Sequence, residues 1–446
     1  MLGFAGPLGC KTKAPVAPQE AGVASPMGNW DAWRDLSPLV DVAESHAPPA
    51  IQSALVQARV LIRDGKLRSA ELHLRKFANA EGRDWIATAR GDLAALYFTR
   101  CIRGVAFRLQ DLEKGGEPPS RQADFSEDTA IEPGDVSVEA TLTDLEQAVS
   151  SKVPALAVQA RIARARMAAY ASQCPANAEV ARMTEDTVKR DLAILAAEGH
   201  LTPDLSFMWA GLQYAEFSGA AAKPFLLQAR DAGYSDPTVI YMLAVIALEQ
   251  LDLDNADTLA VEAIEVYKQI GDPMQEAQCH FIRGEVARQR KQGQQAHVHY
   301  QAALKLVPTH VASLLGGTRL VLSTKGPSAA VGYLEKTLPT LLFSGELDPE
   351  HAQRAASNLE ALVVMAREPE LADLCRAALL SNVDGEPEPL RRGIRYFYAA
   401  TLDARLGEYD HARGHAIMAR DEFSETALGE ALTEQVNTFL GRIDAG

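Results

Sequence analysis

The chain has 446 residues and a formal net charge of −15, and 47% of its residues are hydrophobic while only 6% are aromatic. This acidic balance argues against a nucleic-acid partner, because proteins that bind a phosphate backbone generally present a basic stripe. Much of the apolar content is alanine and leucine, which are strong helix formers, so we predict an all-α fold.

Residues 1–29 are rich in proline, alanine and glycine, which predicts a flexible N-terminal tail. Within this tail, "LGCKTK" around Cys10 resembles the end of a bacterial lipoprotein signal, although Pro7 departs from the usual leucine. Two alternatives follow: the chain is cytoplasmic as written, or its true start lies upstream and it is an envelope lipoprotein with Cys10 lipidated. We predict no transmembrane span, because no apolar run reaches the roughly 18 residues required, so membrane contact is expected only through Cys10.

Residues 30–114 are expected to form a helical region, with one helix-pair unit at 51–84 around the turn "RDGK" and a long helix from Trp85 to Lys114. Residues 115–140 are acidic and contain three prolines, which predicts a solvated loop; the alternative is an acidic docking segment that occupies a groove of this chain. Degenerate helical repeats are expected over 141–202. There the basic run "RIARARMAAY" is predicted to form a solvated helix face.

A helix–turn–helix pattern is clearest between Ala277 and Pro308. Gly284 in the first helix and Ala296 in the second are small, so the two backbones are predicted to approach closely, while Tyr300 fills the gap beyond them. Pro308 ends the second helix because it lacks an N–H. The polar turn between them is "RKQG". The residues at regular spacing are Gly284, Ala287, Ala296, Tyr300, Ala303 and Pro308.

This spacing resembles the tetratricopeptide repeat (TPR). Similar units recur at steps of about 34 residues, the TPR length. They begin at Pro203, Pro237, Val311 and Gly393, and a degenerate one begins at Gln353. The resemblance implies a right-handed α-solenoid of stacked helix pairs over 203–424, followed by a capping helix over 425–446.

The resemblance also implies a concave groove lined by the first helix of each pair. Its mixture of aromatic and arginine side chains is typical of a surface that binds a protein or peptide segment. The alternative is that several of these side chains pack between helices. The predicted groove residues are Phe207, Tyr214, Tyr241, Val245, Leu248, Phe281, Glu285, Arg288, Leu315, Arg319, Ile394, Phe397 and Arg405.

Histidines offer the best candidates for a metal site. His297 and His299 lie about 200 degrees apart on a helix and cannot share an ion, whereas His411 and His415 are four residues apart and share one face. Asp403 or Glu408 would be a third ligand. Without an H-E-x-x-H motif, and on a second helix of the repeat, the pair is predicted to be surface histidines, with no metal and no cofactor.

No phosphate-binding loop or nucleophile-elbow motif occurs in the sequence, so we predict no catalytic residues and no enzyme activity. The five cysteines, Cys10, Cys101, Cys174, Cys279 and Cys375, are far apart and are expected to be reduced. The prediction is a non-enzymatic scaffold that binds a protein or peptide in its groove. The alternatives are an envelope lipoprotein with the same groove acting in envelope assembly, and a metal-dependent enzyme built on His411 and His415.

Overall fold

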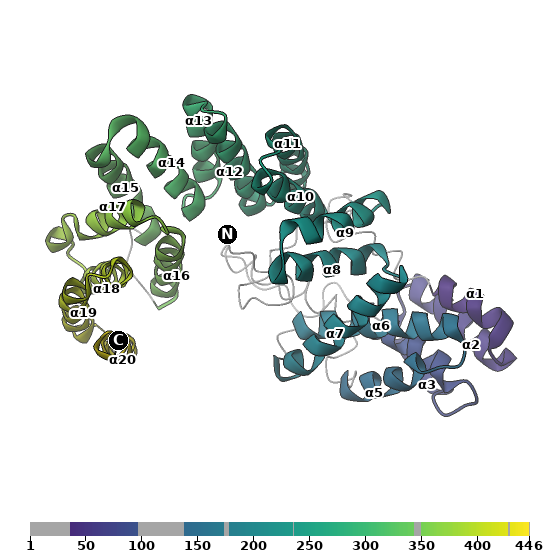
Figure 1. Ribbon diagram of the computed structural model, residues 1–446. Helices are drawn as coiled ribbons and strands as arrows, with labels where there is room; N and C mark the ends of the chain where they lie inside the picture. The colour runs from purple at the N-terminus through teal and green to yellow at the C-terminus, as the bar shows by residue number, and fades with distance from the viewer. Residues whose placement is uncertain are drawn as a thin grey trace. The chain divides into compact units, whose positions relative to one another are not determined.

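The computed structural model describes residues 36–96, 138–173, 178–234, 236–342, 349–426 and 429–445. Every regular element within these ranges is a helix (Figure 1). Successive helices pack against one another in pairs along the chain, as in α2·α3, α8·α9, α12·α13 and α18·α19. The chain is therefore an all-α solenoid, which confirms the predicted fold class.

The chain divides into two compact units, and the division falls at Glu249, inside the predicted array of 203–424. Unit 1 contains the described residues up to Glu249 together with Gln269–Asp272. It holds a helical segment at 83–96 and the helices α1 (Ser37–His46), α2 (Pro49–Arg63), α3 (Leu67–Arg75), α5 (Val138–Val149), α6 (Pro154–Gln173), α7 (Ala178–Glu198), α8 (Pro203–Glu216), α9 (Gly219–Asp231) and α10 (Pro237–Glu249).

Unit 2 contains Gln250–Lys268 and the described residues from Pro273 onward. Its helices include the predicted capping helix at the C-terminus. They are α11 (Leu253–Ile270) as far as Lys268, α12 (Pro273–Gln289), α13 (Gly293–Leu306), α14 (Val311–Lys325), α15 (Pro327–Leu342), α16 (Pro349–Met365), α17 (Pro369–Leu380), the short 3-10 helix η4 (Val383–Gly385), α18 (Pro389–Leu406), α19 (Tyr409–Ser424) and α20 (Gly429–Ala445).

Proline marks the start of many of these helices. Its fixed φ suits the first helical position, and its missing N–H would have no partner inside the helix there. The helices that begin with proline are α2, α6, α8, α10, α12, α15, α16, α17 and α18. The prolines therefore set the helix boundaries.

Three predicted segments differ from the structure or lie beyond it. The tail and most of the predicted loop fall outside the described residues, but α5 begins at Val138, so the last residues assigned to the loop are helical. Leu142, Leu145 and Ala148 explain this start, since they recur every third residue and Leu145 and Ala148 are fully buried. Of the predicted Trp85–Lys114 helix, residues 83–96 are helical and the remainder lies outside the described ranges.

Close helix packing around Tyr300 confirms the predicted role of Gly284. Tyr300 is fully buried, and a Cβ added at Gly284 would lie 2.5 Å from its ring. Gly316 on α14 approaches the same ring from the next pair, where an added Cβ would lie 2.7 Å away. Gly393 meets Phe423 in the same way, at 2.5 Å. Small residues on first helices thus make room for one large ring on a second helix.

Four of the turns inside the helix pairs share one backbone feature. A residue with positive φ stands between the two helices: it is Gly65 between α2 and α3, Gly326 between α14 and α15, and Gly407 between α18 and α19, but Lys291 between α12 and α13. Glycine adopts this conformation without steric cost, whereas a side chain there is strained. The repeat is thus visible in the backbone even where the turn sequence varies.

The basic run on α6 is a correction to the sequence analysis, because it does not form a solvated face. Arg164 is only 2% exposed and binds Asp191 of α7 through two hydrogen bonds of 2.7 Å, and Asp191 is fully buried. Arg166 is half-buried and binds both oxygens of Asp204 at 2.8 and 2.9 Å. Partner carboxylates on later helices are what allow these arginines to leave water.

Cys279 and Cys375 are both buried, and burial raises the pKa of Cys375 to about 12. Cys10, Cys101 and Cys174 lie outside the described residues. Within the described ranges, no helix is both long and apolar enough to cross a membrane.

Candidate functional site

The first helices of the pairs in unit 2 form a continuous face. Helix α12 contacts α14, α14 contacts α16, and α16 contacts α18 (Figure 1). We call the side chains that these four helices leave exposed or partly exposed the first-helix face. From the predicted groove set it includes Glu285, Arg288, Arg319, Phe397 and Arg405.

Five predicted groove residues do not belong to an open surface. Their side chains are 9% exposed or less, so they pack between helices, which was the alternative considered from the sequence. These residues are Phe207, Val245, Phe281, Leu315 and Ile394.

The arginines of the first-helix face are already bonded within unit 2. Arg288 donates to Glu285 at 2.7 Å, and Arg319 donates to Glu368 at 2.8 Å. Arg405 donates to the backbone carbonyl of Val363 on α16. A ligand at this face would share or replace these bonds, so the arginines are positioned by the fold before anything binds.

Glu285 links the first-helix face to the core beneath it. One of its carboxylate oxygens accepts a hydrogen bond from the Tyr300 hydroxyl at 2.5 Å, while the other accepts a hydrogen bond from Arg288. Burial and the nearby Glu285 charge raise the pKa of the Tyr300 hydroxyl, so it stays protonated. Leu320 and Met365 pack partly exposed against the same cluster and add apolar area that the sequence analysis did not assign.

Phe397 lies where the first-helix face meets the capping helix. Its ring contacts Phe439 of α20 edge-on, with centroids 5.6 Å apart, and Tyr398 at 5.5 Å. Tyr398 in turn donates its hydroxyl to the carbonyl of Ala356 on α16 at 2.8 Å. Helix α20 thus shapes this end of the face.

Unit 1 carries the remaining groove candidates. Tyr214, Tyr241 and Leu248 are half-buried on α8 and α10. The Tyr214 hydroxyl donates to Glu249 at 2.5 Å, which ties the end of α8 to the end of α10. Burial raises the pKa of Tyr214 above that of a free tyrosine, so its hydroxyl stays protonated and remains a hydrogen-bond donor.

A buried acidic cluster in unit 1 was missed from the sequence. Arg166 binds Asp204 directly and lies 3.7 Å from Asp92. Burial raises the pKa of Asp92 to about 6, whereas Arg166 holds the pKa of Asp204 below its usual value despite burial. No motif relates these positions, since their separation along the chain has no helical period; only the fold brings them together.

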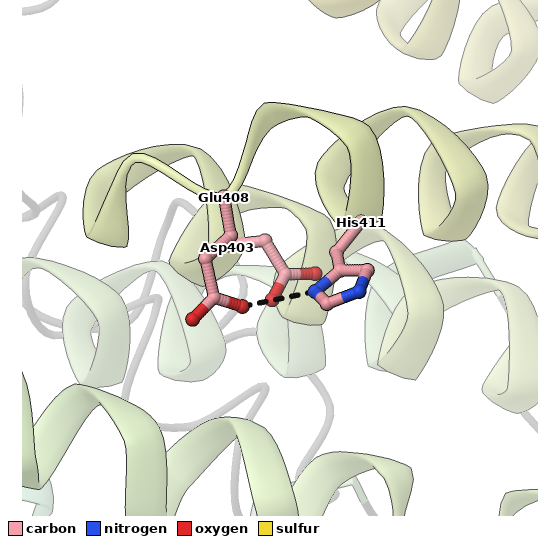
Figure 2. A group of neighbouring side chains, drawn as sticks. All are labelled: Asp403, Glu408 and His411. Carbon is pink, nitrogen blue, oxygen red and sulfur yellow. Dashed lines mark hydrogen bonds and ion pairs between the residues drawn. The ribbon is translucent and has the colours of Figure 1, made fainter.

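The candidate metal residues lie where α17, α18 and α19 meet. Asp403, Glu408 and His411 offer ligand atoms within 4.8 Å of one another, and Figure 2 shows the ring of His411 facing Glu408. His411 Nδ1 lies 3.0 Å from Glu408, and His415 Nδ1 lies 2.6 Å from the fully buried Asp403.

Arg376 of α17 balances the charge of this group. Its guanidinium donates to Asp403 at 2.8 Å and also to Glu408. Hydrogen bonds from His415 and Arg376 offset the burial of Asp403 and keep the pKa of that carboxyl below its usual value. The two carboxylates therefore already have a cationic partner, and an ion placed between them would have to displace it.

No protein-family model matches the sequence, and no curated protein is similar to it at a significant level. Among solved structures, a monomeric mutant of IFIT1 with m7Gppp-AAAA aligns over 89% of this chain and 96% of its own, at 12% identity and a TM-score of 0.28. A second IFIT1 mutant, with Gppp-AAAA, aligns at 13% identity and a TM-score of 0.26, over 89% of this chain and 96% of its own. A circular tandem repeat protein aligns at 15% identity and a TM-score of 0.19, over 93% of this chain and 95% of its own. At these TM-scores no residue of this chain is equated with one of theirs.

Proposed function

We propose that this chain is a scaffold of the TPR kind that binds a protein or peptide segment along the first-helix face of unit 2. The observation that carries the proposal is the continuity of this face. Four first helices contact in sequence, and their side chains at Phe397, Leu320, Met365 and Arg319 are partly exposed while Arg405 is exposed. Apolar area flanked by arginine forks suits a segment with apolar and acidic side chains.

Nucleic acid is not the partner that we propose. The net charge of −15 would repel a phosphate backbone, and the arginines of the face are bonded to Glu285, Glu368 and a carbonyl. An RNA-binding measurement at low salt belongs beside the protein-binding test, and tight binding to an RNA oligonucleotide would contradict this part of the proposal.

We also infer that the chain has no enzyme activity of its own. The ionisable cluster at α18 and α19 consists of Asp403, Glu408, His411 and His415. Arg376 donates to both of its carboxylates, and each histidine is hydrogen-bonded to one of them. We therefore interpret this network as one that orients side chains.

Site-specific photo-crosslinking tests the scaffold proposal. A photoreactive amino acid replaces Arg319 or Arg405 on the first-helix face, and matched controls carry it at Val298 or Ile417, which are exposed on second helices. We expect one protein adduct from native extract that forms from the first-helix positions and not from the controls. Equal adducts from both faces, or adducts from the second helices alone, would refute the proposal. Phe281 is unsuitable for this test because it is buried.

The lipoprotein alternative remains a prediction, since Cys10 lies outside the described residues. Mass spectrometry of the N-terminal peptide from membrane and soluble fractions tests it. A diacylglyceryl group on Cys10 would place the same scaffold at a membrane surface, whereas an unmodified peptide that continues upstream of Cys10 would exclude the anchor.

A further inference from the structure

His411 and His415 have a second property, separate from the proposed scaffold function. They lie one turn apart on α19, so their side chains share a face, with Cβ atoms about 5 to 6 Å apart. His411 has 70% of its side chain exposed and His415 has 22%. Solvent therefore reaches both rings.

The hydrogen bonds of these rings fix which nitrogen carries the proton. In each histidine it is Nδ1 that faces a carboxylate, at 3.0 Å for His411 and Glu408 and at 2.6 Å for His415 and Asp403. A carboxylate accepts but does not donate, so Nδ1 holds the hydrogen and the neutral ring keeps its lone pair on Nε2. Figure 2 shows one ring nitrogen of His411 facing Glu408 and the other turned away from both carboxylates.

This arrangement is the one in which imidazole binds metal ions. Metal-binding histidines typically donate the other ring N–H to a carboxylate, which holds the tautomer and the ring and raises the basicity of the binding nitrogen. Tyr396 constrains His415 further, because the two rings stack with centroids 6.2 Å apart and an interplanar angle of 17°.

Arg376 explains why the carboxylates themselves are not the ligands. It donates to both Asp403 and Glu408, so its positive charge offsets theirs while each carboxylate also accepts a hydrogen bond from a histidine. An ion held by the Nε2 atoms would leave the Arg376 bonds intact, whereas an ion held between Asp403, Glu408 and His411 would break them. The carboxylates therefore orient the histidine rings and do not bind the ion themselves.

We propose that His411 and His415 form a binding site for one divalent transition-metal ion on α19, with their Nε2 atoms as ligands and water in the remaining positions. Glu408 and Asp403 are positioning residues in this site. Imidazole ligands favour Zn²⁺, Ni²⁺ and Cu²⁺ over Mg²⁺ and Ca²⁺, which prefer oxygen. Such an ion would cross-link two side chains that are one turn apart on α19.

Metal titration of untagged, full-length protein tests the site. Ni²⁺ or Zn²⁺ binding is measured by calorimetry, and we expect one equivalent whose affinity falls at least tenfold in H411A and in H415A. The matched control is H297A, because His297 is also exposed on a second helix but its neighbour His299 lies two positions along. We expect H297A to bind as the wild type does.

Two further measurements separate a chelate from a single-histidine contact. Glu408→Gln keeps an oxygen that accepts from His411 but removes the charge, and we expect it to weaken the binding of Ni²⁺ by about tenfold, in line with other carboxylates behind metal ligands. Cu²⁺ bound to the protein should show two equivalent imidazole nitrogens by electron paramagnetic resonance. Affinity that changes less than twofold in H411A or H415A, or a spectrum with one imidazole, would overturn the proposal.

Discussion

Helix α6 of unit 1 and helix α12 of unit 2 are both covered by neighbouring helices, but their contacts depend on different chemistry. Around α6, two arginines are taken out of water by carboxylates on later helices, as in Arg164 with Asp191 and Arg166 with Asp204. Around α12, Gly284 has no side chain, and the ring of Tyr300 fills the space that a side chain there would occupy. The first contact should be sensitive to charge and the second to volume.

The largest effect is expected from Asp191→Ala. The substitution removes the bidentate partner of buried Arg164 and leaves it only the exposed Glu146, and breaking a buried pair typically costs about 3 to 5 kcal/mol. Denaturant unfolding of the purified protein measures the loss. Asp144→Ala is the control, since Asp144 is half exposed and lies 3.7 Å from Arg90, and exposed pairs contribute about 1 kcal/mol or less. Similar losses in both variants would show that burial of the pair is unimportant.

Gly284→Ala tests the volume side of the comparison. The added methyl group would lie 2.5 Å from the Tyr300 ring, and the resulting shift should cost about 1 to 3 kcal/mol. Gly332→Ala is the matched control in α15, where an added Cβ meets nothing within 4 Å. We expect the control to stabilise the protein by roughly 0.5 to 1 kcal/mol, because alanine favours a helix over glycine. Thermal unfolding of the two variants should therefore shift in opposite directions.

The charge side also predicts a dependence on pH. Burial raises the pKa of Asp92 and of Asp236 from 3.8 to about 6. Each folded-state pKa lies above the unfolded value, so the folded state binds these protons more tightly, and the contribution of these two groups to stability falls as pH rises from about 4 through 6.

Asp236→Asn isolates one of these groups. Asp236 accepts the Thr238 N–H at 2.8 Å at the start of α10, and asparagine keeps an oxygen for this bond without the buried charge. We expect the variant to be more stable than the wild type by roughly 1 to 2 kcal/mol at pH 8 and equal to it near pH 4. Unfolding free energies at both pH values check this, and an equal change at both would show that the charge is not responsible.

The smallest effect is expected at the turn between α12 and α13. Lys291 has a φ of 60°, in the position that glycine occupies in other pairs. Lys291→Gly relieves the steric cost, but the greater freedom of glycine in the unfolded chain offsets part of the gain, so we expect about 0.5 kcal/mol of stabilisation. A loss of stability in thermal unfolding would mean that the lysine side chain contributes more than its backbone costs.

Local features of the fold could be predicted from the sequence, and contacts over distance could not. Gly284, Tyr300 and the turn "RKQG" lie within one repeat, so their spacing predicted the α12–α13 contact. The burial of Arg164 and Arg166 could not be predicted, because it depends on Asp191 and Asp204 in other helices.

The site shows the same limit. Periodicity placed Phe281 and Leu315 on first helices but could not separate the side of each helix that the next pair covers from the side left open. The four-residue spacing of His411 and His415 was visible in the sequence. That Glu408 and Asp403 would hold both Nδ1 atoms was not.

Two thiols that are buried in the described part of the chain make local opening measurable in the native protein. Cys279 lies on α12 and Cys375 on α17, and at neutral pH the raised pKa of Cys375 leaves almost none of it as the reactive thiolate. A thiol reagent can therefore modify these residues only when their helices transiently separate from their neighbours. The modification rate at each position, followed by peptide mass spectrometry, would give the frequency of opening at two places in unit 2 without any substitution.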